Sequence, residues 1–199
     1  MKKLSLIAAC MVVAAPQAFA QAKNFEGFSV GLNAEMTRST TEASPLSASD
    51  GSNSTGTGLQ LQYSLALTDR FLLGLGATAS FGTLTAGSSA ALGVDFTTKN
   101  RSSFDITPSY ALTDTTLLYG KVSALSATGV ATLQGTSTEE SKSLNGVGYG
   151  LGLRTLVDKN VFLQLGYDWN KYNDVTNNAG TATLKSTSNV FSLGVGYKF

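Results

Sequence analysis

The sequence predicts an all-β protein in which eight antiparallel strands, in up-and-down order, close into a single transmembrane β-barrel. Three observations lead to this fold class: strands of alternating apolar residues, tight turns at a regular spacing, and long polar connections between them. No apolar run after residue 20 approaches the roughly 20 residues that a membrane helix needs. If the chain crosses a membrane, it must therefore do so as a closed set of strands.

The last strand carries the clearest pattern. From Asn189 to the C-terminus one face is apolar and partly aromatic, whereas the other face carries Gly, Ser, Val and Lys. An apolar face with aromatic residues at its ends suits the lipid side of a bacterial outer-membrane barrel. The ending resembles the C-terminal signal that the barrel-assembly machinery recognises, so Tyr197 and Phe199 are the predicted assembly signal. The apolar face consists of Phe191, Leu193, Val195, Tyr197 and Phe199.

Tight turns recur along the chain. Asp69, Asp114 and Asp158 each lie in a short polar turn between two alternating strands, with spacings of 45 and 44 residues. The strands that flank these turns, together with Phe28 to Met36 and Asn189 to Phe199, make eight. The remaining connections are rich in Ser, Thr, Ala, Asn and Gly, and we expect long external loops near residues 38–57, 83–99, 128–145 and 173–187. Short turns on the periplasmic side and long loops outside would place both termini in the periplasm.

The first 20 residues have the features of a cleaved secretory signal peptide. Lys2 and Lys3 precede a short apolar stretch, and Ala18-Phe19-Ala20 is a cleavage site of the A-x-A type. The competing interpretation is a lipoprotein signal ending at Cys10, which would leave only about six apolar residues before the lipidated cysteine. Cleavage after Ala20 leaves residues 21–199 as one domain without cysteine, and changes the formal charge from +1 to −1.

Three strand segments, residues 117–122, 148–154 and 194–199, carry a family pattern. Through them, residues 21–199 resemble the eight-stranded outer-membrane barrels of the OmpA-barrel, OmpX and opacity-protein type. The resemblance implies the outer membrane of a Gram-negative bacterium. A soluble lipocalin-type barrel would also have eight alternating strands. However, charged residues make up only 14% of the chain, and the side chains on the less apolar strand faces are too small and too rarely charged for an ordinary soluble surface.

Side-chain alternation places a set of charged and polar residues in the barrel interior. An eight-stranded barrel has room inside for side chains only, so buried charges must pair or be hydrated. We predict an interior plug in which carboxylates hold Lys121 and Arg154. The alternative is a narrow pore whose charged ring sets ion preference. Counted in residues from the turns, Lys121 and Arg154 lie nearer the periplasmic end than Asp105 and Asp168. Their long side chains must bridge this offset. The predicted interior network is Glu35, Asp105, Lys121, Arg154 and Asp168, with Gln60, Gln62, Gln164 and Tyr119.

Composition argues against catalysis. The chain contains no histidine, the side chain best suited to proton transfer near neutral pH, and barrel enzymes of the outer membrane resemble one another in needing one. Without histidine, or cysteine after cleavage, we expect no catalytic site, no transition-metal site and no cofactor. The near-zero charge likewise gives no reason to expect a nucleic-acid partner.

Three functions remain open at this stage. The first is a structural or surface-interaction (adhesion-like) role through the external loops, and the second is a narrow porin-like channel. The third is a carrier of small apolar molecules of the OmpW type, for which no apolar lumen lining is evident. The expected partners are outer-membrane lipids, lipopolysaccharide and the barrel-assembly machinery, and the expected state is a monomer. The sequence does not identify a ligand for the loops.

Overall fold

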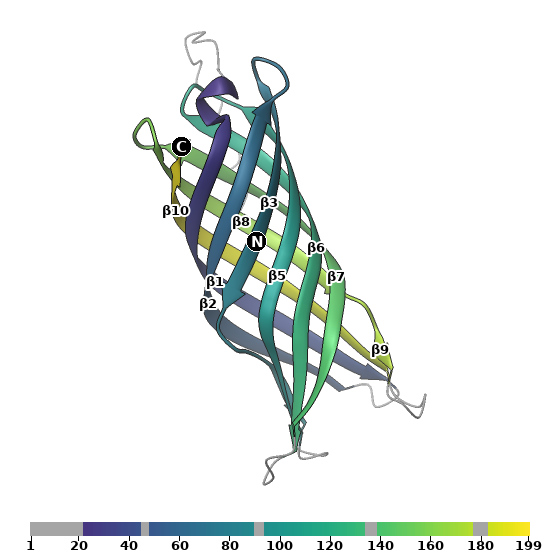
Figure 1. The fold of residues 1–199 in the computed structure, drawn as a ribbon. Helices are drawn as coiled ribbons and strands as arrows, with labels where there is room; N and C mark the ends of the chain where they lie inside the picture. Colours follow the sequence, from purple (N-terminus) through teal and green to yellow (C-terminus); the bar gives the residue numbers. More distant parts are fainter. Residues whose placement is uncertain (1–21, 45–47, 90–93, 134–138, 177–182) are drawn as a thin grey trace, which may run out of the picture.

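The computed structural model describes residues 22–44, 48–89, 94–133, 139–176 and 183–199 (Figure 1). The predicted signal peptide lies outside these residues. None of the helices in the described part of the chain is both long and apolar enough to cross a lipid bilayer. The elements are η1 (Ala22–Phe25), β1 (Gly27–Ser44), β2 (Ala48–Ala66), β3 (Phe71–Phe81), β4 (Leu84–Ser89), β5 (Val94–Ala111), β6 (Thr116–Leu133), β7 (Glu139–Leu156), β8 (Val161–Tyr172), β9 (Val175–Thr176) and β10 (Thr183–Lys198).

Eight long strands form a closed antiparallel barrel. Their order around the barrel is β1-β2-β3-β5-β6-β7-β8-β10, and β10 pairs with β1 to close it. The two short strands are side branches, since β4 pairs with β5 and β9 with β10. The predicted fold class and strand number are confirmed. The seam between β1 and β10 runs from Ser29 opposite Lys198 to Ser44 opposite Thr183, and Phe199 N donates to Phe28 O at 2.9 Å.

One end of the barrel carries the three tight turns, and we call it the turn end. In the first turn the hydroxyl of Thr68 accepts the backbone N–H groups of Arg70 and Phe71, at 3.3 and 3.0 Å. Thr113 does the same in the second turn, and in the third the carboxylate of Asp158 accepts the N–H of Lys159. Side-chain oxygens that satisfy turn N–H groups stabilise tight connections, and Thr68, Thr113 and Asp158 have this role here.

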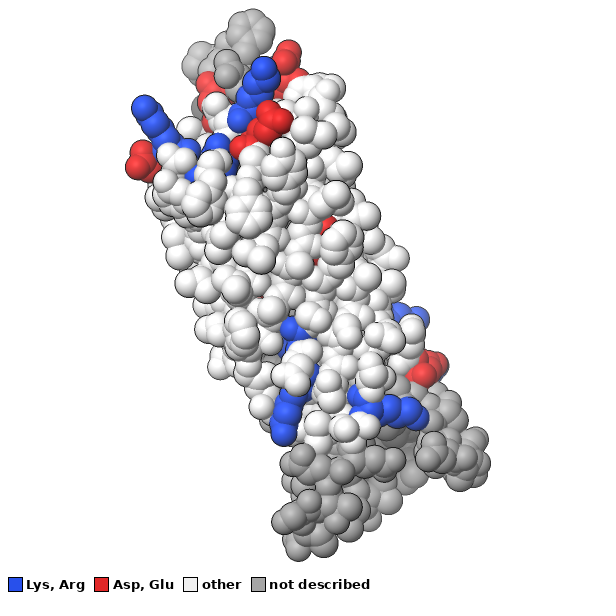
Figure 2. Space-filling view, viewed as in Figure 1, with Lys and Arg blue, Asp and Glu red and all other residues white. Residues whose placement is uncertain are grey.

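The outer wall is apolar between two charged ends. Outward side chains along the strands are mostly Leu, Val and aromatic residues, and they are exposed where a soluble protein would bury them. Figure 2 shows the same pattern, with a broad uncharged band separating the Lys, Arg, Asp and Glu residues at the two ends. Aromatic contacts lie at both margins of this band: Tyr149 stacks on Trp169 on one side, and Phe199 meets Tyr197 on the other.

The opposite end, which we call the hairpin end, differs from the prediction. Residues expected in long loops are largely paired strand, because β1 reaches Ser44, β2 begins at Ala48 and their register continues to Ala43 opposite Ala48. The same holds for β5 with β6 and for β6 with β7. Strands of 18 or 19 residues are nearly twice the roughly 9–11 that cross a bilayer. The hairpins therefore continue beyond the apolar band as β-structure.

At the hairpin end the extended strands form two hydrogen-bonded groups. Pairing of β2 with β3 ends at Thr57 opposite Phe81, and pairing of β7 with β8 ends at Gly146 opposite Tyr172. Beyond these points β10, β1 and β2 stay together, and so do β4, β5, β6 and β7, which gives the two tips at the bottom of Figure 1. The break between β3 and β4 lies at Gly82, whose φ of 114° is in the region that favours glycine.

Candidate functional site: the barrel lumen

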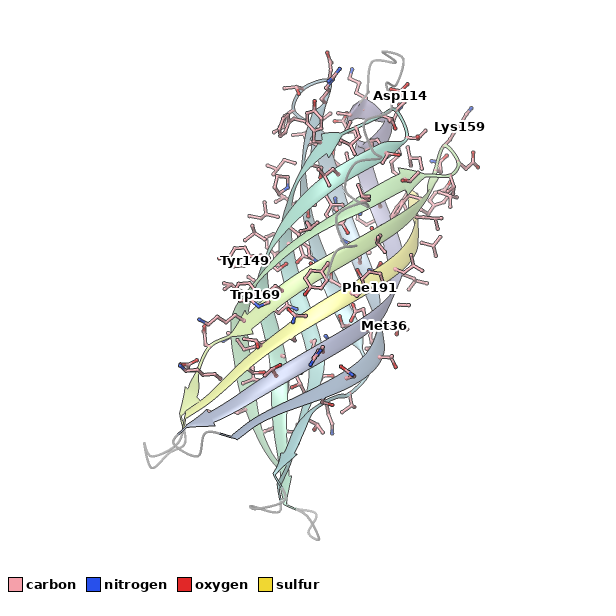
Figure 3. The ribbon with its side chains drawn as sticks, turned by 180° about the vertical axis from the view of Figure 1, so that it is seen from behind. Met36, Asp114, Tyr149, Lys159, Trp169 and Phe191 are labelled. Carbon is pink, nitrogen blue, oxygen red and sulfur yellow. The ribbon has the colours of Figure 1, made fainter. Side chains whose placement is uncertain are left out.

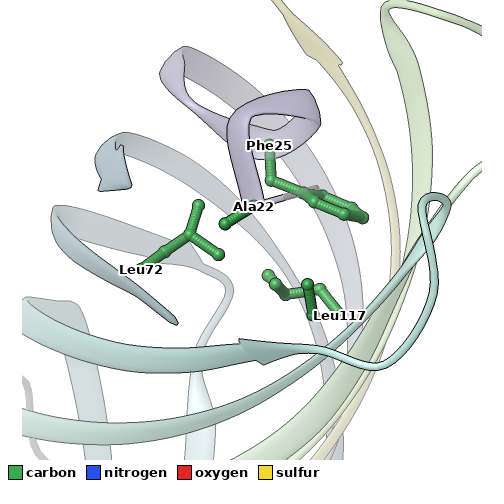
Figure 4. Packing of buried hydrophobic residues seen from close by; sticks show 5 residues of the cluster. Ala22, Phe25, Leu72 and Leu117 are labelled. Atoms are coloured by element: carbon green, nitrogen blue, oxygen red, sulfur yellow. The ribbon is translucent and has the colours of Figure 1, made fainter. Parts of the chain in front are cut away.

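A short helix closes the lumen at the turn end. Helix η1 places Ala22 and Phe25 against Leu72, Ala111 and Leu117, and all five side chains are buried (Figure 4). Its two ends are attached to the barrel, since Ala22 N donates to Asp69 O at 2.8 Å and Asn24 Nδ2 donates to Asp114 O at 3.0 Å. This apolar cap covers the mouth of the barrel, and the sequence analysis did not predict it.

The next layer toward the hairpin end is built around Arg154. Its guanidinium donates to the Oε1 atoms of Gln164 and Gln62, at 2.9 and 3.2 Å from Nη2, and it lies 4.3 Å from the ring centre of Phe162. Gln164 in turn donates to Asn33 Oδ1 at 2.6 Å and to Gln60 Oε1. The prediction that a carboxylate holds Arg154 is wrong: the contacts found for its guanidinium in the described part of the lumen are amide oxygens and an aromatic face.

Lys121 and Asp168 form an ion pair across the middle of the lumen. Lys121 Nζ lies 2.8 Å from Asp168 Oδ2, and both side chains are mostly buried. Lys121 lies opposite Gly150, and Gly150 lies opposite Asp168, so all three share one row of paired residues. Because the strands tilt, this row slants along the barrel axis, and the long side chain of Lys121 spans the distance to Asp168. Counting residues from the turns could not identify this shared row, because neighbouring strands of a barrel are staggered by its shear.

A second ion pair lies closer to the hairpin end. Arg101 Nη2 donates to Glu35 Oε2 at 3.0 Å, and Ser80 Oγ donates to Glu35 Oε1 at 2.9 Å. Arg101 was missed by the sequence analysis. It lies just beyond an expected loop and beside a bulge where Asn100 adopts a φ of 51°, yet it is four residues before the inward Asp105 and therefore shares its face. With Arg101 included, the interior network contains three acidic and three basic side chains.

Asp105 is the third interior carboxylate. It is almost fully buried and accepts hydrogen bonds from Thr78 Oγ1 at 2.8 Å and Ser123 Oγ at 2.6 Å. Tyr119, also inward, donates its hydroxyl to Leu165 O at 3.2 Å. The structure thus places all five predicted network residues in the lumen and joins one predicted pair, Lys121 with Asp168.

Glycines on the inner wall create the space that these side chains occupy. A Cβ atom at Gly150 would collide with Asp168 Oδ1, and one at Gly58 would collide with Glu35 Oε1. Tyr119 fills the space left by Gly152 and Gly166 in the same way. Each ion pair therefore spans the lumen across strands that contribute glycine at the crossing point. The inward glycines therefore make room for neighbouring polar side chains.

The lumen contains a small cavity on the hairpin side of the network. It has a volume of about 50 Å³, and both ion pairs contribute to its wall together with Ser123, Asn170 and Tyr172. That volume suffices for a few water molecules. Two hydroxyls and the Nε atom of Arg101 are buried near this level without a partner among the described residues. Nowhere in those residues do three or more His, Cys, Asp or Glu side chains gather as a metal site would require.

The predicted assembly signal lies on the outside of the turn end. Phe199 is 68% exposed, and its ring lies 5.9 Å from that of Phe28 and 5.1 Å from that of Tyr197. Tyr197 also faces outward and is exposed. Both side chains are therefore accessible from outside the barrel.

Comparisons with solved structures identify the fold. The attachment invasion locus protein Ail of Yersinia pestis, solved with the heparin analogue sucrose octasulfate, has a TM-score of 0.54 at 17% identity and covers 87% of this chain and 99% of its own. The Neisserial surface protein A has a TM-score of 0.55 at 17% identity and covers 87% of this chain and 98% of its own. OprG of Pseudomonas aeruginosa has a TM-score of 0.54 at 13% identity and covers 87% of this chain and 96% of its own.

One structural relative is an enzyme. The outer membrane protease OmpT of Escherichia coli has a TM-score of 0.50 at 9% identity, covering 86% of this chain and 96% of its own. At these identities the likeness concerns the fold alone. No curated protein sequence matches this chain. The family model for the outer membrane protein beta-barrel domain matches residues 5–199, and this chain therefore belongs to the outer membrane β-barrel family.

Proposed function

We propose that this protein is a non-enzymatic outer-membrane barrel with a sealed lumen, which serves a structural or surface-interaction role through its extended hairpins. In this proposal the turn end and both termini face the periplasm, and the hairpin end faces outward. The protein works as a monomer in contact with outer-membrane lipids and lipopolysaccharide, after insertion by the barrel-assembly machinery.

The observation that carries the proposal is the filling of the lumen at successive levels. The cap of Ala22 and Phe25 covers the turn end. The amide layer around Arg154 follows toward the hairpin end, and beyond it two ion pairs cross the barrel. A channel would need a continuous water-filled path through these layers. The cavity of about 50 Å³ reaches the two ion pairs, but its lining includes neither the amide layer around Arg154 nor the cap.

The hairpin end offers the surface for an interaction role. Six of the eight barrel strands continue past the apolar band, so the hairpins stand on β-structure. Ail was solved with a polysulfated ligand, but in this chain the hairpin ends carry five basic and six acidic residues outside the lumen network. Taken over the whole hairpin end, that balance does not favour a polysulfated ligand of this kind. Uncharged hydroxyl and amide groups, which dominate these hairpins, favour contacts with polar surfaces instead.

The proposal excludes catalysis despite the structural likeness to a protease. The chain has no histidine, and the interior carboxylates are engaged: Glu35 and Asp168 by basic partners, Asp105 by two hydroxyls. Carboxylate oxygens that already accept these contacts inside the lumen are not free to act on a substrate.

Two measurements test the proposal. Planar-bilayer recordings of the refolded protein should show no steady open-channel events. On intact cells, an epitope inserted between Leu133 and Glu139 should be accessible to antibody, whereas one inserted at the Asp114 turn should not. Replacing one hairpin end at a time with a Gly-Ser linker should then reduce attachment of cells to surfaces without reducing the amount of folded barrel.

The results that would contradict the proposal are specific. Regular conductance in the parent would favour the narrow porin-like channel. Uptake of a small apolar solute that depends on this protein would favour an OmpW-like carrier. Labelling at Asp114 rather than between Leu133 and Glu139 would reverse the proposed orientation.

A further inference from the structure

One face of the barrel carries basic residues directly beyond the lipid-facing band. On the neighbouring strands β1, β10 and β8, the last row of fully apolar contacts joins Met36, Phe191 and Tyr167. Figure 3 shows Met36, Phe191, Trp169 and Tyr149 along this margin, far from Lys159 at the turn end. Toward the hairpin end the next two rows place Arg38 opposite Asn189, Asn189 opposite Trp169, and Lys171 opposite Thr187.

Arg38 and Lys171 are the two cations of this face that can accept a ligand. Both side chains are exposed, and neither contacts a carboxylate among the described side chains. Lys185 lies opposite Glu42 in the register, so we leave Lys185 out of the site. Asp174 is exposed but follows Lys171 by three residues, farther from the apolar band. Asn189 lies between the two cations and adds an amide.

The height of these cations corresponds to the lipid headgroups. Each strand residue rises about 3.3 Å, or about 2.3 Å along the membrane normal at a tilt of about 45°. Rows of paired residues slant relative to the membrane because the strands tilt, so Met36 and Trp169 both lie at the margin although they belong to neighbouring rows (Figure 3). Arg38 is two residues beyond Met36 and Lys171 is two residues beyond Trp169, so each lies about 5 Å past the margin. The polar layer of a bilayer is roughly 5–7 Å deep on each side. The guanidinium and ammonium groups therefore lie where lipid phosphates are found.

Their separation points to a headgroup with more than one phosphate. Arg38 and Lys171 are two strands apart and offset by two residues, so their backbones are separated by roughly 12 Å. One phosphate would have to draw both side chains inward, whereas two phosphates at the ends of a disaccharide can meet one cation each. An indole ring beside sugar and phosphate groups is a favourable neighbour at this depth, because its polar N–H can face the headgroup.

We propose that Arg38, Asn189, Trp169 and Lys171 form a binding site on the outer wall for the diphosphorylated glucosamine disaccharide of lipid A. Arg38 and Lys171 bind the phosphates, Asn189 lies between them and Trp169 contacts the sugar. This site deepens the proposed function, because lipid A occupies the outer leaflet only if the hairpin end faces outward.

Trp169 is the only tryptophan of the chain, so its fluorescence reports directly on this site. The refolded protein in phosphatidylcholine nanodiscs would be titrated with lipid A that carries a nitroxide quencher on its headgroup. Trp169 should be quenched, and unlabelled diphosphorylated lipid A should reverse the quenching. The Arg38→Gln/Lys171→Gln variant should need about thirtyfold more labelled lipid for half-quenching, since one basic residue near a charged surface contributes about a fivefold change.

Matched variants distinguish binding at this site from general electrostatic attraction between lipid A and the protein. Lys23→Gln/Lys159→Gln removes two exposed charges at the turn end and should leave the titration unchanged. Arg38→Lys/Lys171→Arg keeps both charges, each meeting one phosphate, and should bind within about twofold of the parent, which also controls for misfolding. Equal quenching in the Gln variant, or equal competition by dephosphorylated lipid A or phosphatidylglycerol, would overturn the site. These titrations do not depend on orientation in cells, so they can fail while the proposed function stands.

Discussion

The ion pair between Lys121 and Asp168 gives the sharpest test of how the lumen is held together. Lys121→Met preserves the length of the side chain but leaves Asp168 as an uncompensated carboxylate, and its side chain is only 14% exposed. Removing one partner of a buried pair costs about 3–5 kcal/mol. We expect a value near the lower limit, about 3 kcal/mol, because the adjacent cavity has room for water beside Asp168. Adding Asp168→Asn to this variant removes the charge and should recover most of that loss.

The assay is equilibrium unfolding in urea in lipid bilayers, followed by Trp169 fluorescence and by the change in gel mobility between folded and heated protein. The parent, both single variants and the double variant form a complete cycle. If each single substitution costs about 3 kcal/mol and the double variant clearly less than their sum, the pair is coupled as its 2.8 Å contact implies. Additive costs would show that the two residues act independently and would refute this account of the lumen.

Three further perturbations test the wall and the C-terminus. Gly150→Ala should destabilise the barrel in the same assay because its Cβ would displace Asp168, whereas Gly120→Ala, whose Cβ would have no neighbour closer than 3.8 Å, should have little effect. Leu163→Arg on the lipid-facing side should cost about 2–4 kcal/mol and Leu163→Ala far less, and an equally stable Arg variant would contradict the assigned faces. Deleting Phe199 should lower outer-membrane assembly in cells while barely changing refolding in vitro, and equal assembly of mutant and parent would remove it from the signal.

The fold could be predicted because lipid imposes a simple rule on each strand. Residues such as Leu163 and Leu165 face lipid while Gln164 faces the lumen, so an alternating pattern marks both the strand and its orientation. The rule fails beyond the membrane. There both faces of a strand are polar, as in residues 52–57 of β2, and the alternation disappears although the backbone pairing continues. The strand extensions were therefore mistaken for loops.

The candidate site was harder to predict because its contacts depend on the stagger between strands. Alternation identified which residues face inward, but not that Lys121 and Asp168 share a row while Arg154 lies opposite Gln164. The apolar cap had a weak local signal: Ala22 and Phe25 are spaced three apart, which places both on one side of a 3₁₀ turn. Nothing in the sequence indicated that this turn would fold back over the barrel mouth.

The glycines of the inner wall have a consequence for how such a barrel diverges over evolution. Asp168 requires the missing side chain of Gly150, and Asn33 similarly occupies the space that a Cβ at Gly194 would take. A substitution that introduces a large interior side chain can therefore be accepted only where a neighbouring strand has, or acquires, a small residue opposite it. The two substitutions should covary. Outward positions need only remain apolar. This division of constraints lets sequences drift to 17% identity while the barrel is kept, and it makes correlated large-small exchanges a better guide to distant relatives than conserved residues.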